Sequence, residues 1–316
     1  MTSTDTSFFS CLEKRVSTAN SLLCIGLDPH VSQLKSSDGK EPTAEDAKKF
    51  CLNIIQQSAP FAAAFKPNSA FFEYFGADGM KALAEVIESI PPEIPVILDV
   101  KRGDIETTAQ AYAFASYEMC KGMNDNINLF VNIVHYLFSF KLFALLVGSV
   151  TLAPYMGWDS VRPFVSGDFQ GKGVFVLCKT SNPSSADFQN QEFADGTTLF
   201  EKVAKKCSEW NSSLVTPAIG LVVGKPLDFA HLFPCLYSYN KTVLFFVLAR
   251  QGATDIQALA RVRHVSDAWI LCPGVGAQGG SAKDVCRVGL RSDGSGLLVS
   301  RERVLHLIFD SLFYKL

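Results

Sequence analysis

The sequence lacks the charge surplus, the paired cysteines and the targeting segment that mark several classes of protein. The 316-residue chain has a formal net charge of −2, so it shows no basic footprint for nucleic acid. Its nine cysteines include no Cys-x-x-Cys pair. This predicts scattered thiols in a reducing, cytoplasmic compartment rather than a disulfide framework or a zinc site. No basic segment followed by an apolar run opens the sequence, and we expect no secretory signal.

Motifs for metals and nucleotides are also missing. The sequence has no His-rich cluster, HExxH, Walker A or Rossmann glycine pattern, so these motifs indicate no metal and no nucleoside triphosphate. One apolar tract, residues 122–148, is nearly long enough to cross a bilayer, but Asn132, His135 and Lys141 interrupt it. We therefore expect no membrane partner. A small molecule held by a local site is the predicted partner.

Short apolar runs recur along the chain and are separated mostly by helical patterns such as residues 43–57 and 78–90. Near-continuous apolar strands that alternate with helices are typical of a parallel sheet covered on both faces. Eight such runs predict an α/β fold, a (β/α)₈ TIM barrel, as one domain spanning residues 1–316. The predicted strands are residues 22–27, 61–66, 94–100, 149–154, 173–178, 217–223, 268–273 and 296–300.

Polar residues follow several of these strands directly. Asp28, Lys66, Asp99, Lys101 and Ser181 all lie at or just beyond the carboxyl end of a predicted strand. In an α/β barrel this rim carries the catalytic residues. A single charged strand end is often only a solvated loop, but five polar residues at one rim indicate an active site.

The stretch ILDVKRGDI, residues 97–105, concentrates these charges. Side chains alternate along a strand, so Asp99 and Lys101 point to the same side, and Lys66 projects into the same barrel mouth. Asp104 follows a Gly103 turn, where its carboxylate either joins the array or caps the next helix. An ammonium between carboxylates stays protonated and is ready to donate a proton to a carbanion. A fixed carboxylate beside a substrate carboxylate also favours its departure as CO₂.

A glycine-rich stretch, CPGVGAQGG at residues 272–280, follows the seventh predicted strand. Glycines let backbone N–H groups approach an oxyanion closely, and barrels often bind phosphate after strands seven and eight. The stretch therefore predicts a phosphate site, with an ordinary glycine-rich turn as the alternative.

Six stretches of the chain match a known family: CIGLDPH (24–30), FKPNSAFFEYFG (65–76), VKRGDIETTAQAYA (100–113), TLAPYMGW (151–158), CKTSNPSS (178–185) and CPGVGAQGG (272–280). Together with ILDVKRGDI, these motifs resemble the orotidine 5′-phosphate decarboxylase family, in the branch that is common in bacteria and also found fused to orotate phosphoribosyltransferase. The resemblance covers about residues 9 to 300 and implies conversion of orotidine 5′-phosphate to UMP in pyrimidine biosynthesis, without metal or cofactor.

The resemblance also implies roles for individual residues. Lys101 would donate the proton to C6 of the pyrimidine, and Asp99 and Lys66 would complete the charged network. The family forms homodimers with shared active sites, in which Asp104, Ile105 and Thr108 reach the neighbouring site. Asp28 would hold the ribose hydroxyls, and Ser181 would contact the pyrimidine edge. Gly276 and Gln278 would bind the phosphate.

The sequence departs from the family pattern in three places. Apolar tracts at about residues 122–148 and 225–251 stand where family members have short connections, as insertions or as translated intervening sequence. Family members follow the eighth strand with a phosphate-binding arginine, for which Arg301 or Arg303 is the substitute here. These departures leave a catalytically silent homologue as one alternative. A second alternative is a related Mg²⁺-dependent sugar-phosphate decarboxylase or aldolase, which shares the D-x-K-x-x-D pattern of residues 99–104.

Overall fold

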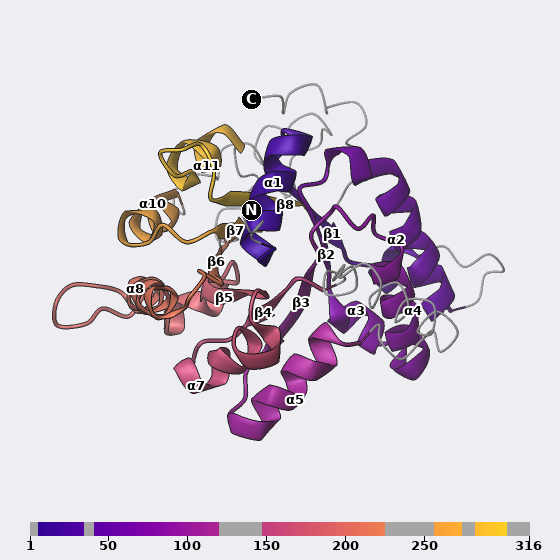
Figure 1. Cartoon of the computed structure of the whole chain (residues 1–316), viewed down its shortest axis with the longest axis horizontal. Helices are drawn as coiled ribbons and strands as arrows, with labels where there is room; N and C mark the ends of the chain where they lie inside the picture. The colour runs from indigo at the N-terminus through magenta and orange to yellow at the C-terminus, as the bar shows by residue number, and fades with distance from the viewer. Residues whose placement is uncertain (1–5, 35–40, 120–146, 225–255, 274–281, 302–316) are drawn as a thin grey trace, which may run out of the picture. The chain divides into compact units, whose positions relative to one another are not determined.

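The computed structural model describes residues 6–34, 41–119, 147–224, 256–273 and 282–301. Its strands form one eight-stranded sheet in the order β2-β1-β8-β7-β6-β5-β4-β3 (Figure 1). Isolated parallel bridges join β2 and β3, the two ends of this order, at Phe65 with Val96 and at Asn68 with Asp99. The order is therefore cyclic and follows the chain, which confirms the predicted (β/α)₈ fold. The strands are β1 Leu23–Leu27, β2 Ala64–Pro67, β3 Ile97–Arg102, β4 Ser149–Leu152, β5 Gly173–Lys179, β6 Ile219–Val223, β7 Ile270–Cys272 and β8 Leu297–Arg301.

Helices lie between the strands along the chain. The two helical patterns predicted at residues 43–57 and 78–90 are confirmed as α2 and α4. The α-helices are α1 Phe8–Ala19, α2 Ala44–Ser58, α3 Ser69–Glu73, α4 Gly76–Glu88, α5 Glu106–Tyr117, α7 Trp158–Val161, α8 Leu199–Ser213, α10 Ile256–Val265 and α11 Ala282–Gly289. Short 3₁₀ turns are η1 Val31–Gln33, η2 Ala59–Phe61, η4 Arg162–Phe164, η5 Gly167–Phe169 and η6 Pro183–Asp187.

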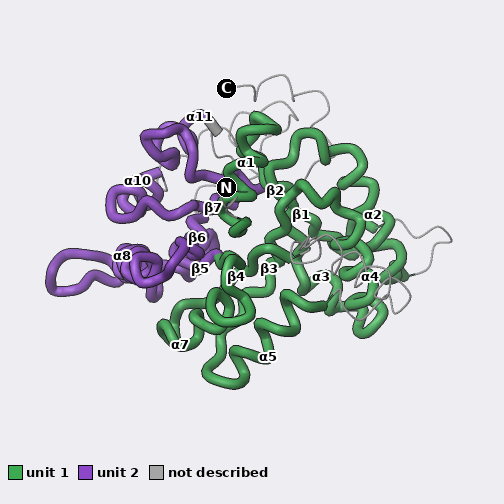
Figure 2. Tube along the Cα trace, viewed as in Figure 1, with its two compact units in different colours: residues 1–174, 304–316 green, residues 175–303 purple. Residues whose placement is uncertain are grey.

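The chain divides into two compact units (Figure 2). One comprises residues 1–174 and 304–316, and the other comprises residues 175–303. The expectation of one domain over residues 1–316 stays a prediction. The two apolar tracts predicted as insertions lie outside the described residues, apart from Val147 and Gly148.

The first unit contains β1 to β4 and the helices that follow them. Parallel ladders join β1 to β2 and β3 to β4. Phe65 of β2, Phe72 of α3 and Leu83 of α4 are completely buried in its core. Burial of each such side chain stabilises the fold by about 1.5–3 kcal/mol.

Helix α2 shows why the sequence forms a helix at this point. Thr43 is its N-cap and forms a capping box with Asp46, in which each side chain accepts the other residue's backbone N–H. The apolar residues of the helix recur at helical spacing and form its buried face, which includes Ala47, Cys51, Ile54 and Ile55. Helix α2 packs against α4.

The second unit contains β5 from Phe175 onward and β6 to β8, with parallel ladders between β6 and β7 and between β7 and β8. Phe175 of β5 is completely buried there. Its ring lies against Gly220 of β6 so closely that a Cβ atom at position 220 would lie 2.6 Å from the ring. Glycine at this position therefore makes room for the phenylalanine.

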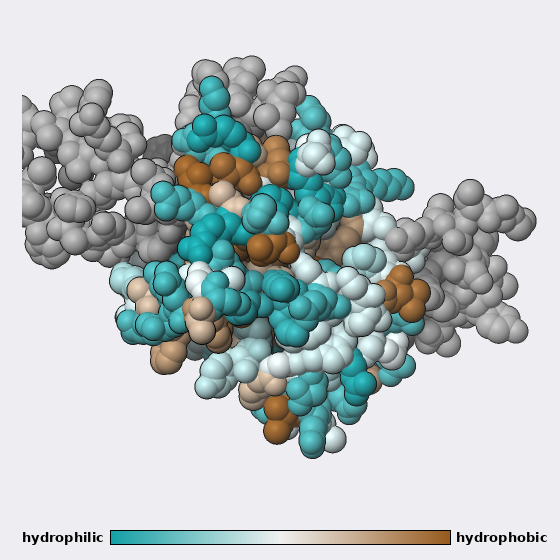
Figure 3. Space-filling model, turned by 90° about the vertical axis from the view of Figure 1, so that its left-hand side faces the viewer, coloured by the Kyte–Doolittle hydropathy of each residue, from teal (hydrophilic) through white to brown (hydrophobic). Residues whose placement is uncertain are grey.

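Figure 3 shows how polar and apolar residues are distributed over one face of the molecule. On the face in Figure 3, hydrophilic residues predominate and apolar residues lie in small separate groups. None of the helices described in the structure is long and apolar enough to cross a bilayer. Residues 122–148, for which polar residues within an apolar tract led us to expect no membrane span, lie almost wholly outside the described residues.

Candidate active site

A cluster of three charged side chains lies where β2 and β3 end, within the first unit. Lys66 is on β2, and Asp99 and Lys101 are on β3. The Nζ atom of Lys66 lies 3.2 Å from Oδ2 of Asp99, and Nζ of Lys101 lies 2.7 Å from Oδ1 of the same carboxylate. This confirms the predicted proximity of the three side chains, with Asp99 bridging the two ammonium groups.

The members of the cluster differ in exposure. The side chains of Lys66 and Asp99 are 5% and 8% exposed, whereas that of Lys101 is 52% exposed. A buried ion pair is costly to desolvate and requires well-placed partners. Asp99 therefore stabilises a buried ammonium on one side and holds a solvent-accessible ammonium on the other. Only Lys101 is accessible enough to meet a substrate and exchange a proton with water.

The electrostatics keep the buried pair ionised. Burial lowers the pKa of Lys66, but the nearby carboxylates of Asp28 and Asp99 outweigh this effect, and the net shift is upward. Burial raises the pKa of Asp99, but Lys66 and Lys101 dominate and lower that pKa to about 2. Both groups are consequently charged at neutral pH.

The backbone at Lys101 is unusual. Its φ angle is +44°, in the left-handed region that residues other than glycine rarely adopt. The register between β3 and β4 shifts between Leu98 and Arg102, as in a β-bulge. Strained backbone of this kind costs about 1–3 kcal/mol and concentrates at functional sites. The bulge redirects the chain just where the lysine side chain leaves the strand.

Asp28 is buried one residue after β1, with 4% of its surface exposed. Its Oδ2 atom has no hydrogen-bond partner among the described residues. A buried carboxylate oxygen without a partner is rare and calls for an explanation, such as a ligand group that is bound during function. Asp28 is thus suited to accept hydrogen bonds from a ligand.

Asp104 does not join the cluster of its own chain. Its Oδ1 accepts the backbone N–H of Ile105 at 2.8 Å, and among the described residues it makes no ion pair with Lys66 or Lys101. It also does not cap α5, because Ile105 is the N-cap residue and the helix begins at Glu106. The alternative of a simple helix cap is therefore wrong. Asp104 is half-buried, and Ile105 and Thr108 beside it are exposed.

The predicted contacts to the pyrimidine edge and the phosphate lie in the second unit. Ser181 is half-buried just after β5, with its Cβ packed near Gly224. The adjacent Lys179 is buried and donates hydrogen bonds to Ser185 and Asn190, both at 2.9 Å. These bonds stabilise the loop that carries Ser181. The other predicted phosphate-site residues Gly276, Gln278 and Arg303 lie outside the described residues, and for Arg301 only the backbone is described.

Two polar residues near these sites were not predicted. Thr151 of β4 donates a hydrogen bond to Asp99, and Lys179 supports the loop after β5. Thr151 lies inside the apolar run SVTLAP and Lys179 directly follows the run GVFVLC; a polar residue within or directly after a buried strand is the available signal. Within the described ranges, no group of three or more His, Cys, Asp or Glu side chains is arranged to hold a metal ion.

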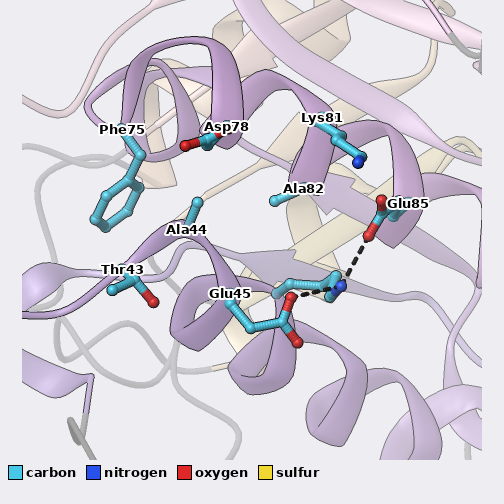
Figure 4. A pocket seen from close by; sticks show the side chains of 9 residues that line it. Thr43, Ala44, Glu45, Phe75, Asp78, Lys81, Ala82 and Glu85 are labelled. Atoms are coloured by element: carbon cyan, nitrogen blue, oxygen red, sulfur yellow. Dashed lines mark hydrogen bonds and ion pairs between the residues drawn. The ribbon is translucent and has the colours of Figure 1, made fainter.

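A pocket of about 470 Å³ lies elsewhere in the first unit, between α2 and α4 (Figure 4). Lys48 lies in this pocket and pairs with Glu45 at 2.6 Å and with Glu85 at 2.8 Å. None of the residues that line it belongs to the charged cluster. The pair with Glu85 links α2 to α4, whereas the pair with Glu45 lies within α2, and we assign the pocket no role in the chemistry at the strand ends.

Comparison with known proteins gives a consistent answer. A family model described as orotidine 5′-phosphate decarboxylase / HUMPS family matches residues 21–126, which include Asp28 and the charged cluster. The chain is 34% identical to orotidine 5′-phosphate decarboxylase of Cupriavidus metallidurans over 289 residues, which cover 90% of this chain and 84% of that protein.

Solved structures similar to this chain belong to the same family as its sequence relatives. The structure of Leishmania donovani OMP decarboxylase matches with a TM-score of 0.69 and 37% identity, over 98% of this chain and 94% of the other. The structure of Leishmania donovani UMP synthase matches with a TM-score of 0.69 and 39% identity over 94% of this chain, which spans only 51% of that longer protein. With this similarity over most of its length, the chain belongs to the orotidine 5′-phosphate decarboxylase family.

Proposed function

We propose that this chain decarboxylates orotidine 5′-phosphate to UMP in pyrimidine biosynthesis, and that Lys101 protonates C6 of the pyrimidine. The observation that carries the proposal is the array of Lys66, Asp99 and Lys101, in which one buried carboxylate holds an accessible ammonium at 2.7 Å. In this array, the negative charge of Asp99 would repel the substrate carboxylate, and the ammonium of Lys101 would supply a proton to the carbon from which that carboxylate departs.

In the proposed reaction, the bond from C6 to the carboxylate breaks and its electron pair stays on C6 while CO₂ departs. Lys101 then donates a proton to C6, and its amine regains a proton from water. Because the Asp99 carboxylate accepts a hydrogen bond from the Lys101 ammonium at 2.7 Å, it fixes the direction of the donor. Lys66 contributes by keeping Asp99 ionised in its buried position.

Asp99 also acts on the substrate in this proposal. A substrate carboxylate bound next to Asp99 experiences repulsion between like charges, and this repulsion disappears when the group leaves as neutral CO₂. The buried position of Asp99 strengthens the effect, because little water screens the two charges.

The rest of the substrate would contact residues beyond the cluster. Asp28 would accept hydrogen bonds from ribose hydroxyls, which supplies a partner for its buried Oδ2. Ser181 would contact the pyrimidine edge. Gly276 and Gln278 would bind the phosphate through the glycine-rich stretch after β7, with Arg301 or Arg303 as the arginine that pairs with it.

We further propose a homodimer with shared active sites, in which Asp104, Ile105 and Thr108 complete the site of the neighbouring subunit. Asp104 is not paired with its own cluster, and Ile105 is 47% exposed. Tyr155 and Met156 after β4 are 95% and 39% exposed, and Met156 lies near the Gly103 turn. Exposed apolar residues beside a functional loop are typical of an interface.

The cytoplasm is the proposed location of the enzyme. None of the seven cysteines in the described part of the chain forms a disulfide, and most of them are buried. Reduced cysteines are typical of a reducing compartment.

The function is tested by following the ultraviolet absorbance of orotidine 5′-phosphate with the purified chain in the presence of EDTA. We expect turnover that EDTA does not change. Turnover that EDTA abolishes would indicate a Mg²⁺-dependent relative of the family instead. No turnover by folded protein would indicate a catalytically silent homologue.

The shared site is tested by mixing two inactive variants, Lys101→Ala and Asp104→Ala. In a hybrid dimer, one of the two sites contains both native residues, and we expect activity to recover on mixing after exchange of subunits. Each variant mixed with itself is the control. If mixing restores no activity although hybrid dimers form, Asp104 does not act across an interface.

A further inference from the structure

The hydroxyl of Thr151 makes three hydrogen bonds at the edge of the charged cluster. It donates to Oδ1 of Asp99 at 2.7 Å. It accepts the backbone N–H of Val100 at 3.1 Å and that of Lys101 at 2.9 Å. A threonine hydroxyl has one hydrogen to donate and two lone pairs, so these three bonds use its full capacity.

The two accepted bonds stabilise the β3 bulge. Where the register between β3 and β4 shifts, the N–H groups of Val100 and Lys101 bond to the Thr151 side chain of β4. Lys101 has its left-handed φ angle at this point. Strained backbone persists only where surrounding contacts hold it, and the hydroxyl supplies two such contacts.

The donated bond constrains the protonation of Asp99. Because both lone pairs of the Thr151 oxygen receive backbone N–H groups, its hydrogen is directed to Oδ1 of Asp99, which must be an acceptor. That same oxygen accepts from Lys101 Nζ. The charged groups that face Asp99 are Lys66 from β2 and Lys101 from β3, and β4 contributes the neutral hydroxyl of Thr151.

We propose that Thr151 is a positioning residue for the decarboxylation: its hydroxyl holds the Asp99 carboxylate and the Lys101 backbone in one geometry, and so aims the Lys101 ammonium. The proposal rests on the proposed function of Lys101 and Asp99. Thr151 itself contacts neither the reacting carbon nor the proton that moves. Its effect on turnover passes through the two residues that it holds.

The test compares Thr151→Val, which keeps the shape of the side chain but lacks the hydroxyl, with Thr151→Ser, which keeps the hydroxyl. We expect kcat of Thr151→Val to fall about 100-fold with little change in KM, because small misplacement of a catalytic group has effects of this size. Thr151→Ser should retain kcat within a few-fold. Thr151→Ala and Thr151→Ser form a second pair that differs only in the hydroxyl, and it carries the same prediction should Thr151→Val fail to fold.

Ser149 offers a matched control on the same strand. It is completely buried two residues earlier, and its hydroxyl has no hydrogen-bond partner among the described residues. Ser149→Ala should leave kcat unchanged. Folding of every variant is checked by urea denaturation, and kcat is expressed per folded enzyme.

The pH profile separates positioning from a merely structural role. The bond from Thr151 is one of the contacts that lower the pKa of Asp99, so its loss should move the acid limb of kcat to higher pH. An unchanged limb with normal kcat per folded enzyme would overturn the proposal, and so would equal losses in Thr151→Val and Thr151→Ser. Because wild-type turnover is measured in the same series, failure of the function itself is distinguished from failure of this inference.

Discussion

Replacement of Asp99 by asparagine removes the negative charge that lies between two ammonium groups. Lys66, whose side chain is 5% exposed, then loses its ion-pair partner at 3.2 Å, and Lys101 loses its partner at 2.7 Å. Loss of one member of a buried ion pair typically destabilises a protein by about 3–5 kcal/mol. The carboxylate of Asp28 also acts on Lys66 and remains in the variant. We therefore expect Asp99→Asn to lower the free energy of unfolding by about 3 kcal/mol, at the lower end of this range.

The assay is urea denaturation of both proteins at pH 7.5 and equal concentration, with the denaturant slope compared to confirm that only stability changes. Glu73→Gln is the control, because Glu73 pairs with Arg102 at 2.9 Å with both side chains partly exposed. Such a pair contributes about 0–1 kcal/mol. If Asp99→Asn costs no more than Glu73→Gln, the buried carboxylate does not hold Lys66 as we argue.

Three further predictions follow from the structure. The pKa of Asp99 is lowered to about 2 in the folded protein. The ionised carboxylate therefore stabilises the fold fully above the unfolded pKa of about 3.9, and this contribution is lost as the pH falls through 2. In urea denaturation, the difference in unfolding free energy between wild type and Asp99→Asn should be constant from about pH 5 to 8 and shrink below about pH 4. Thr43→Ala removes the capping box with Asp46 and should cost about 1 kcal/mol in the same assay, and an unchanged midpoint would contradict it. Gly220→Ala places a Cβ 2.6 Å from the Phe175 ring and should cost about 1–3 kcal/mol, whereas a neutral result would mean that the ring moves freely.

The strands could be predicted from the sequence because each is an apolar run at the centre of a parallel sheet. All eight predicted runs overlap a strand of the structure. Their bounds were less predictable. The run at residues 61–66 begins too early, since Pro60 lies in the 3₁₀ turn Ala59–Phe61 and β2 begins only at Ala64. The run at 149–154 extends too far, because β4 ends at Leu152, two residues before Pro154.

The candidate site was predictable where it depends on strand ends. Lys66 is the last residue but one of β2, Asp99 lies within the neighbouring β3, and the parallel arrangement brings them together. The left-handed backbone of Lys101 and the bonds from Thr151 were not predictable in this way. They depend on a bulge between β3 and β4, about which local sequence is silent. A polar residue inside the apolar run SVTLAP is a signal, but a threonine in a β-strand is ordinary by propensity, so the sequence does not show that this hydroxyl bonds to Asp99.

The most direct test of this account is the rate of orotidine 5′-phosphate decarboxylation by Lys101→Ala, measured by ultraviolet absorbance beside the wild type. Lys81→Ala is the control, because Lys81 is exposed on α4 and lies outside the charged cluster. We predict that Lys101→Ala folds, as judged by urea denaturation, but shows no turnover, while Lys81→Ala matches the wild type. Turnover by folded Lys101→Ala at a rate close to that of the wild type would contradict the assignment of Lys101 as the proton donor.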